Sequence, residues 1–238
     1  MTRPDTTALL SFNAGFVDTT GFLGLQGLFA AHVTGNFVTL AAALVFGTHG
    51  AIGKVLALPE FVMVVALARV VGVALARRKM PALTLLLGAK LIFLFLFFVL
   101  GIAFGPFPDS DVPAALLAAF AGIAAMAVQN AVQRVHFANL PPTTIMTNNT
   151  TQAVLDGVDL LRGAGSPEIR VRFARTFHSI VWFAAGCAVA AILYYLISFW
   201  SLAVSVAIAT AIVVERARHD LEGDPLPQSS ADPSQGRP

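Results

Sequence analysis

The chain has 238 residues, of which 57% are hydrophobic and only 12% are charged, and its formal net charge is +2. Soluble domains carry about twice that share of charged residues, so the composition excludes an ordinary soluble domain and indicates a polytopic protein of the lipid bilayer. So small a net charge gives no indication of nucleic-acid binding. The single cysteine, Cys187, excludes an internal disulfide and a multi-cysteine metal site, and we expect no cofactor.

Six long apolar stretches predict six transmembrane helices within one membrane domain, residues 8–216. Residues 1–7 are expected to form a cytoplasmic N-terminus, without a cleavable signal. Residues 217–238 are rich in Pro, Ser, Gly and charge, which predicts a disordered cytoplasmic tail. The predicted spans are 8–28, 55–76, 81–104, 112–132, 173–197 and 201–214.

Two short polar segments interrupt the apolar sequence. The first, His32–Asn36, lies within an apolar run from Ala8 to Gly47, which is too long for the ~20 residues that cross a bilayer. It is followed by apolar sequence to about Phe46, roughly half a membrane thickness at ~1.5 Å per residue. A related segment, Met146–Thr151, occurs in the second half. We expect each segment to begin a re-entrant half-helix.

The two halves of the chain resemble each other in the order and spacing of their landmarks. Chance similarity in Ala- and Gly-rich sequence is the alternative, but three landmarks in the same order favour duplication. Each half (about 8–105 and about 112–214) has three spans, an odd number, so the two repeats are predicted to be inverted in the membrane. The similar segments are Ala14–Asp18 with Ala125–Gln129, Thr34 with Thr147, and Val71–Ala74 with Ala185–Ala188.

Charge predicts the orientation, because cytoplasmic loops carry an excess of Lys and Arg. Lys54 and the acidic turn Asp109–Asp111 are therefore assigned to the outer face of the membrane. Both termini are predicted to be cytoplasmic. Asp156 and Asp159 are expected to be solvated at the cytoplasmic face. The basic residues assigned to the cytoplasm are Arg3, Arg77–Lys79, Arg134, Arg162, Arg170, Arg172, Arg175, Arg216 and Arg218.

Polar residues at the two breaks form a candidate substrate or pore site. Half-helices that begin there would point their N-terminal amides toward the membrane centre, where amides need protein partners or water. Thr and Asn are good N-caps, and two positive helix ends favour an anion or a solute with acceptor oxygens. We expect the breaks to face each other; the alternative is that their residues only cap packed helices. The residues are Thr34, Gly35, Asn36, Thr147, Asn148 and Asn149.

Asp18 and Arg69 are the other informative pair, because both lie deep within predicted spans. A charge at the bilayer centre costs about 2.5–3.5 kcal/mol on insertion scales, so Asp18 should face the protein interior. Asp18 is either a proton or cation site with Arg69 as gate or counter-ion, or half of a buried pair that fixes helix register. Gln129, at the duplicated position of Asp18, and Asn130 keep hydrogen-bonding capacity without charge. His32, beside the first break, completes the candidate set.

Two groups of motifs carry a resemblance to a known family. Ala14–Asp18, Gly27–Phe29 and Val33–Asn36 are similar to the signature of the YoaK-like bacterial membrane proteins, and Met126–Ala131 with residues 143–147 resembles that family's second-half signature.

The resemblance covers most of residues 8–216 and implies a multi-pass protein of the bacterial inner membrane, in a family of unknown function that supplies no substrate. The sequence departs from the family pattern at Asn148–Asn149, where Thr-Gly would be expected.

The sequence therefore predicts an all-α polytopic integral membrane protein, with six transmembrane helices and two re-entrant half-helices in an inverted three-helix repeat. Its predicted function is a transporter or channel for a small polar solute or anion, with the substrate at the midplane between the half-helix N-termini. A non-transporting membrane partner or regulatory subunit is the alternative. A membrane-embedded enzyme ranks lower, because Asp18 with His32 lacks a nucleophile or metal set. The small residues of 114–131 suit tight packing within the chain or across a homo-oligomer.

Overall fold

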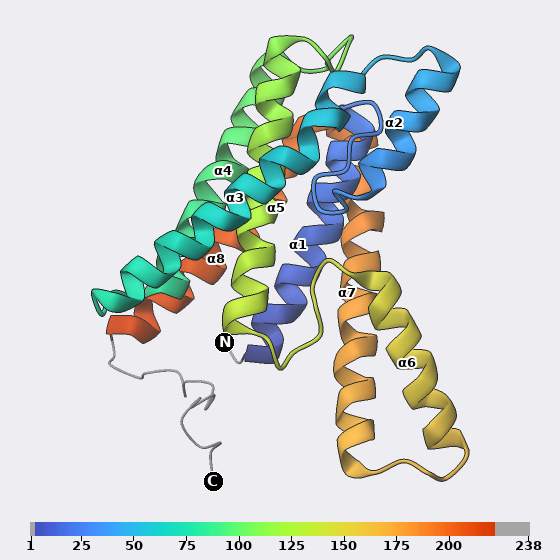
Figure 1. Ribbon diagram of the computed structural model, residues 1–238, viewed down its shortest axis with the longest axis vertical. Coiled ribbons are helices and arrows are strands. Elements are labelled where there is room, and N and C mark those ends of the chain that lie inside the picture. The colour runs from blue at the N-terminus through green and yellow to red at the C-terminus, as the bar shows by residue number, and fades with distance from the viewer. Residues whose placement is uncertain (1–2, 222–238) are drawn as a thin grey trace, which may run out of the picture.

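The computed structural model describes residues 3–221, and the regular structure in that range is helical throughout. A membrane-spanning chain must satisfy its backbone polar groups internally, which helices do. The helices cross one another in a splayed bundle (Figure 1). Their bounds are α1 Arg3–Gly24, α2 Gly35–Phe46, α3 Ala51–Arg77, α4 Ala82–Phe104, α5 Pro113–His136, α6 Met146–Leu161, α7 Pro167–Ile197, the short 3₁₀ turn η1 Ser198–Ser201, and α8 Leu202–Leu221.

Four helical stretches in the described range are long and apolar enough to cross a membrane: α3, α4, α5 and the continuous stretch Pro167–Leu221. This confirms an all-helical, membrane-type chain. The last stretch contains α7 and α8, which run in opposite directions (Figure 1). Helix α8 lies antiparallel to α4. Phe199, just before α8, packs against Gly101 near the end of α4, whereas Asp220 near the end of α8 accepts a hydrogen bond from Thr84 near the start of α4.

Helix α8 continues to Leu221, beyond the predicted end of the membrane domain at 216. Residues 217–221 are therefore helical rather than disordered. The remainder of the predicted tail, 222–238, lies outside the described residues.

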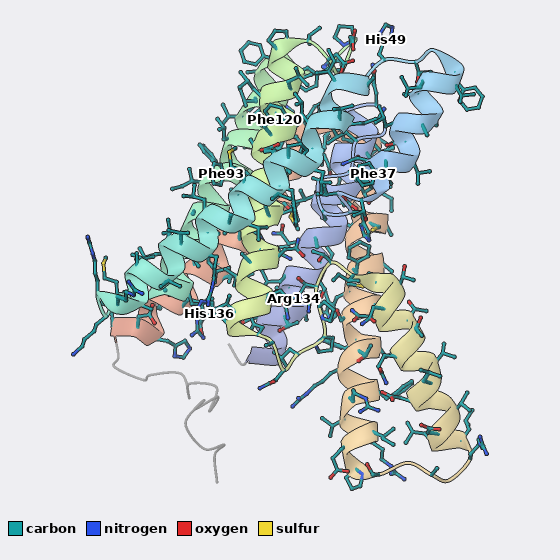
Figure 2. The ribbon with its side chains drawn as sticks, viewed as in Figure 1. Phe37, His49, Phe93, Phe120, Arg134 and His136 are labelled. Carbon is teal, nitrogen blue, oxygen red and sulfur yellow. The ribbon has the colours of Figure 1, made fainter. Side chains whose placement is uncertain are left out.

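Helices α2 and α6 are the short elements that the polar breaks predicted. Each begins near the middle of the molecule, and the two run toward opposite ends of the bundle (Figure 1). Among the described helices, α2 packs against α3 and α6 against α7. The outer face of α2 is apolar and exposed, with Phe37 53% and Val45 78% exposed, as expected of a surface in contact with lipid (Figure 2).

One end of the molecule carries most of the basic residues. The α3–α4 turn with Arg77–Lys79, the end of α5 with Arg134, and the α6–α7 turn lie toward this end, and His49 lies at the opposite end (Figures 1 and 2). We call it the basic end.

Helix α5 forms the centre of the core and packs against α1, α3 and α4. Its Ala-rich sequence allows this close packing on several sides. Lys90 of α4 is also in the interior, 1% exposed, and its amine has no hydrogen-bond partner among the described residues. A buried lysine without a partner is costly in its charged form, so Lys90 opposes the apolar pattern around it.

The backbones of α1 and α7 touch where the two helices cross. A Cβ on Gly15 would collide with the carbonyl oxygen of Phe183, and a Cβ on Gly186 would collide with that of Phe12. Glycine at both positions removes the side chains that would keep the helices apart, as in other closely packed membrane helices. This crossing holds the two halves of the chain together.

We expect Gly15→Ala and Gly186→Ala each to lower the free energy of unfolding by about 1–3 kcal/mol, because the added methyl group meets a main-chain oxygen that cannot move aside. Gly88→Ala is the matched control, since a Cβ there meets no atom within 4 Å. Alanine is the better helix former, so this change should be neutral or stabilising by up to ~1 kcal/mol. Thermal unfolding of the purified proteins in detergent measures the difference. Equal destabilisation by all three changes would contradict the close crossing.

Candidate functional site

The first break is built around the buried carboxylate of Asp18. One of its oxygens accepts hydrogen bonds from the backbone N–H groups of Ala31 (2.7 Å) and His32 (3.3 Å), and the other lies 2.6 Å from Nδ1 of the His32 ring. The Asp18 side chain is 6% exposed and that of His32 is 38% exposed. The pair therefore joins a buried acid to an accessible imidazole.

Asn36, near the start of α2, holds the same loop from the other side. Its amide oxygen accepts from the N–H of Phe29 (2.8 Å), and its amide nitrogen donates to the Phe29 carbonyl (2.9 Å). Both polar groups of one loop residue are thereby satisfied by a single side chain, which a buried loop requires. We call this arrangement the two-bond clamp.

The N-terminus of α2 is closed, in the sense that its first N–H groups are all hydrogen-bonded within the protein. Thr34 stands at the N-cap position of α2, as predicted, but its side chain makes no capping bond. The first amides of the helix instead donate to nearby carbonyls in a tight 3₁₀-like turn, which satisfies them locally. These bonds run from Gly35 to His32 (2.8 Å), from Asn36 to Val33 (3.1 Å) and from Phe37 to Thr34 (3.2 Å).

The second break is tied to α5 by the amide side chains of Gln129 and Asn130. Gln129 donates to the carbonyl of Leu10 (2.9 Å) and to the hydroxyl of Thr143 (3.0 Å), while the oxygen of Asn130 accepts from the hydroxyl of Thr144 (2.7 Å). These threonines lie fourteen positions after their partners, as His32 does after Asp18. Both breaks are therefore anchored in the same way to the helix that precedes them.

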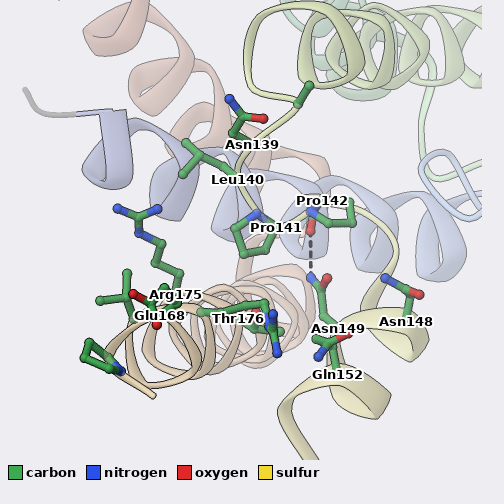
Figure 3. A pocket seen from close by; sticks show the side chains of 14 residues that line it. Asn139, Leu140, Pro141, Pro142, Asn148, Asn149, Gln152, Glu168, Arg175 and Thr176 are labelled. Atoms are coloured by element: carbon green, nitrogen blue, oxygen red, sulfur yellow. Dashed lines mark hydrogen bonds between the residues drawn. The ribbon is translucent and has the colours of Figure 1, made fainter. Parts of the chain in front are cut away.

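Asn149 of α6 corresponds to Asn36, and its amide nitrogen donates to the carbonyl of Pro142, seven residues earlier (2.7 Å; Figure 3). Proline has no N–H group, so the second bond of the clamp cannot form. Within residues 3–221 the amide oxygen of Asn149 accepts no hydrogen bond. We call this arrangement the one-bond clamp.

The N-terminus of α6 is open, in contrast to that of α2. No acceptor within the described range receives the N–H groups of Met146, Thr147 or Asn148; the first amide that is bonded is that of Asn149, to Ile145 (3.3 Å). Ile145 supplies no side-chain cap. Thr147 and Asn148 are exposed and do not cap the helix, contrary to the sequence prediction.

A cavity of about 630 Å³ lies beside this open helix end, between the loop that follows α5, the first turns of α6 and the start of α7. It is lined by amide, hydroxyl and guanidinium groups as well as by prolines (Figure 3). Its polar lining residues are Asn139, Asn148, Asn149, Gln152, Glu168, Arg172, Arg175 and Thr176.

Asp156 and Arg172 lock α6 onto α7 beside this cavity. Asp156 is 1% exposed and receives two short bonds from the guanidinium, 2.9 Å from Nε and 2.6 Å from Nη2, and a third from the amide of Gln152 (2.8 Å). The guanidinium holds the pKa of the Asp156 carboxyl below its usual value. The expectation that Asp156 is solvated is therefore wrong.

The structure does not bring together two pairs that the sequence predicted. Asp18 and Arg69 are apart, since α1 and α3 make no contact with each other and Arg69 is exposed on α3. Asp18 is paired with His32 instead. Helices α2 and α6 make no contact either, so the two breaks do not face each other directly.

The comparisons with known proteins place the chain in a family. A family model described as "Protein of unknown function (DUF1275)" matches residues 6–214. The chain belongs to this family. The DUF1275 match includes both breaks, the cavity and most of α8, so the site described above lies within the family's own domain. No curated protein and no solved structure matches the chain.

Sequence reasoning missed Gln152, Arg172 and Thr143 as parts of the site. The fourteen-residue spacing from Asp18 to His32 recurs from Gln129 to Thr143, and this repeat was a usable signal. Nothing in the sequence marks Arg172 among the several arginines near it, because only the packing of α6 on α7 gives it a buried partner.

We expect Asp156→Asn to destabilise the protein at pH 7 by about 1–3 kcal/mol, less than a fully buried pair because half of the Arg172 side chain is exposed. Because the folded-state pKa of Asp156 is depressed, its contribution is fully present above the unfolded value of about 4 and is lost as the pH falls through the folded value. Melting curves at pH 7 and across the acid range should show wild type and variant converging on acidification.

Asp159→Asn is the control on the same helix, since the Asp159 side chain makes no hydrogen bond with the described residues. If the difference in stability between wild type and Asp156→Asn did not change with pH, the depressed pKa of Asp156 would be contradicted.

Proposed function

We propose that this chain is a membrane transporter or channel for a small polar solute or anion, and that it is not an enzyme. The observation that carries the proposal is a continuous face of α7 that leads from the cavity at the open end of α6 to the Asp18–His32 pair. The substrate path follows this face rather than a single midplane site between two facing helix ends.

Three residues of α7 mark the path, at positions that share one helix face. Thr176 lines the cavity. Ser179 is hydrogen-bonded to Ser11 (2.9 Å) and lies 3.5 Å from the amide nitrogen of Asn149. One turn further, the ring of Phe183 meets the His32 imidazole edge-on, with centroids 5.6 Å apart. Phe183 is thus the apolar barrier between the two breaks.

The helix contacts support an inverted repeat. Suppose that α1, α2, α3 and α4 correspond to α5, α6, α7 and α8. The contact of α1 with α7 then has a counterpart in that of α5 with α3, and the contact of α1 with α8 has one in that of α5 with α4. All four contacts are present. The helices α1 and α5 run in opposite directions (Figure 1). In this arrangement six helices span the membrane, α2 and α6 re-enter from opposite sides, and the basic end faces the cytoplasm.

The chemistry of the cavity favours an anion or a solute with acceptor oxygens. Three unbonded amides at a helix N-terminus attract negative charge. The exposed guanidinium of Arg175 lies at the cavity wall, and Glu168 is the one carboxylate among the lining residues (Figure 3). The free amide oxygen of Asn149 adds one acceptor for a hydroxyl or amide donor.

The Asp18–His32 pair supplies a group that can exchange protons beside the path. Ionisable residues held inside a membrane are a common means of coupling solute movement to a proton gradient. In the proposal, solute crosses passively or with protons.

A non-transporting partner or regulatory subunit is the second candidate, favoured by the closed N-terminus of α2. The polar groups of the first break bond to one another and need no water. If water is also excluded from the second break in the membrane, the two breaks have only a structural role in helix packing.

We expect Thr34→Cys and Thr147→Cys to be labelled by a membrane-impermeant thiol reagent from opposite faces, in a Cys187→Ser background. Both threonines are exposed, and Cys187 is the chain's single cysteine. Labelling of position 34 from outside and of 147 from the cytoplasm is the expected result. Labelling of both positions from one face would contradict the inverted repeat. If both variants fold and neither is labelled, the result would favour the non-transporting partner.

In proteoliposomes we expect at least one of chloride, formate, urea and glycerol to permeate, measured by stopped-flow light scattering. Phe183→Ala should raise that rate by about tenfold, the effect of a barrier lowered by about 1.4 kcal/mol. Phe177→Ala is the matched control, because this ring lies on the outside of the same helix, 53% exposed. An equal effect of both changes, or no permeation by any of the four solutes, would contradict transport along α7.

A further inference from the structure

A second cavity, of about 380 Å³, lies at the basic end and is separate from the path along α7. It is a groove between the last turns of α3, the start of α4 and the end of α5. Its floor is made of small residues, among them Ala68, Gly72, Ala76 and Ala131, which leave space where larger side chains would fill it. Leu86 and Val135 form apolar walls.

The polar residues that line the groove are basic, and no carboxylate is among its lining residues. Arg69 and Arg77 stand two helical turns apart on the same face of α3, and His136 lies across from them at the end of α5. The groove therefore combines an apolar floor with positive charge at its rim.

Arg69 is exposed and makes no hydrogen bond or ion pair within residues 3–221. It stands eight residues before Arg77, the last residue of α3, or about 12 Å along the axis at ~1.5 Å per residue. The helix around it is apolar, and its neighbours Leu67 and Val70 are 59% and 66% exposed. A long arginine side chain on such a surface extends toward the headgroups, where lipid phosphates are the available anions.

We propose that this groove binds the phosphodiester headgroup of an anionic phospholipid from the leaflet at the basic end. The planar guanidinium of Arg69 donates two parallel hydrogen bonds to the phosphate oxygens, which suits arginine better than lysine. Arg77 adds charge nearer the membrane surface, and the glycerol backbone and the first methylene groups lie on the Ala68–Gly72 floor. Basic grooves between membrane helices are a recurrent form of lipid recognition. The site does not depend on transport.

Native mass spectrometry of the delipidated full-length protein tests the assignment, with phosphatidylglycerol and phosphatidylcholine of identical acyl chains as probes. Wild type should bind phosphatidylglycerol about tenfold more tightly than phosphatidylcholine, and Arg69→Gln should remove most of that preference. Arg170→Gln is the matched control, an exposed arginine at the same end that lines neither the groove nor the other cavity.

Gly72→Leu fills the groove without changing its charge, and the nearest atom to a Cβ there is Leu86 Cδ1 at 3.4 Å, an ordinary contact. This variant should lose phosphatidylglycerol as Arg69→Gln does while keeping the wild-type melting temperature. Equal binding of both lipids, equal losses in Arg69→Gln and Arg170→Gln, or unchanged binding in Gly72→Leu would overturn the proposal. Displacement of the lipid by an equal concentration of inorganic phosphate would assign the groove to a soluble anion instead.

Discussion

A helix that breaks inside a membrane must have its freed backbone groups bonded within the protein, and this constraint shapes both halves of the molecule. Asp18 and Asn36 meet it at the first break. At the second, Asn149 binds the Pro142 carbonyl and Gln129 holds the Thr143 hydroxyl, while the first three N–H groups of α6 have no acceptor among the described residues. Each loop is tied to the long helix before it and to the short helix after it. These bonds fix where α2 and α6 begin relative to the long helices.

The glycine crossing of α1 and α7 imposes a second condition. Because the backbones touch at Gly15 and Gly186, these helices have little room to shift relative to each other. In the proposed transporter, any conformational change must then come from elements other than this crossing. Helix α6 is held on α7 by the Asp156–Arg172 pair, and the Pro142 carbonyl is bonded to Asn149 of α6. The crossing and the ion pair therefore join α1, α6 and α7 into one packed wall of the site.

The sequence predicted what depends on local pattern and missed what depends on packing. The breaks near Thr34 and Thr147 and the long apolar helices follow from hydropathy, which is local. The partner of Asp18 does not, because the loop after α1 folds back to place His32 beside it. Nor could composition show that α2 and α6 lie apart, since that follows from the close contact of α1 with α7. Six spans, their orientation and the inverted repeat stay predictions.

Pro142 causes the main difference between the hydrogen bonds of the first break and those of the second. Its missing N–H turns the two-bond clamp of the first half into the one-bond clamp of the second, and leaves an oxygen of Asn149 at the cavity (Figure 3). One proline is enough to turn a two-bond clamp into a one-bond clamp, because the main chain then has no N–H to donate. The difference between the two breaks therefore lies in the main chain, although the clamping side chain is asparagine in both.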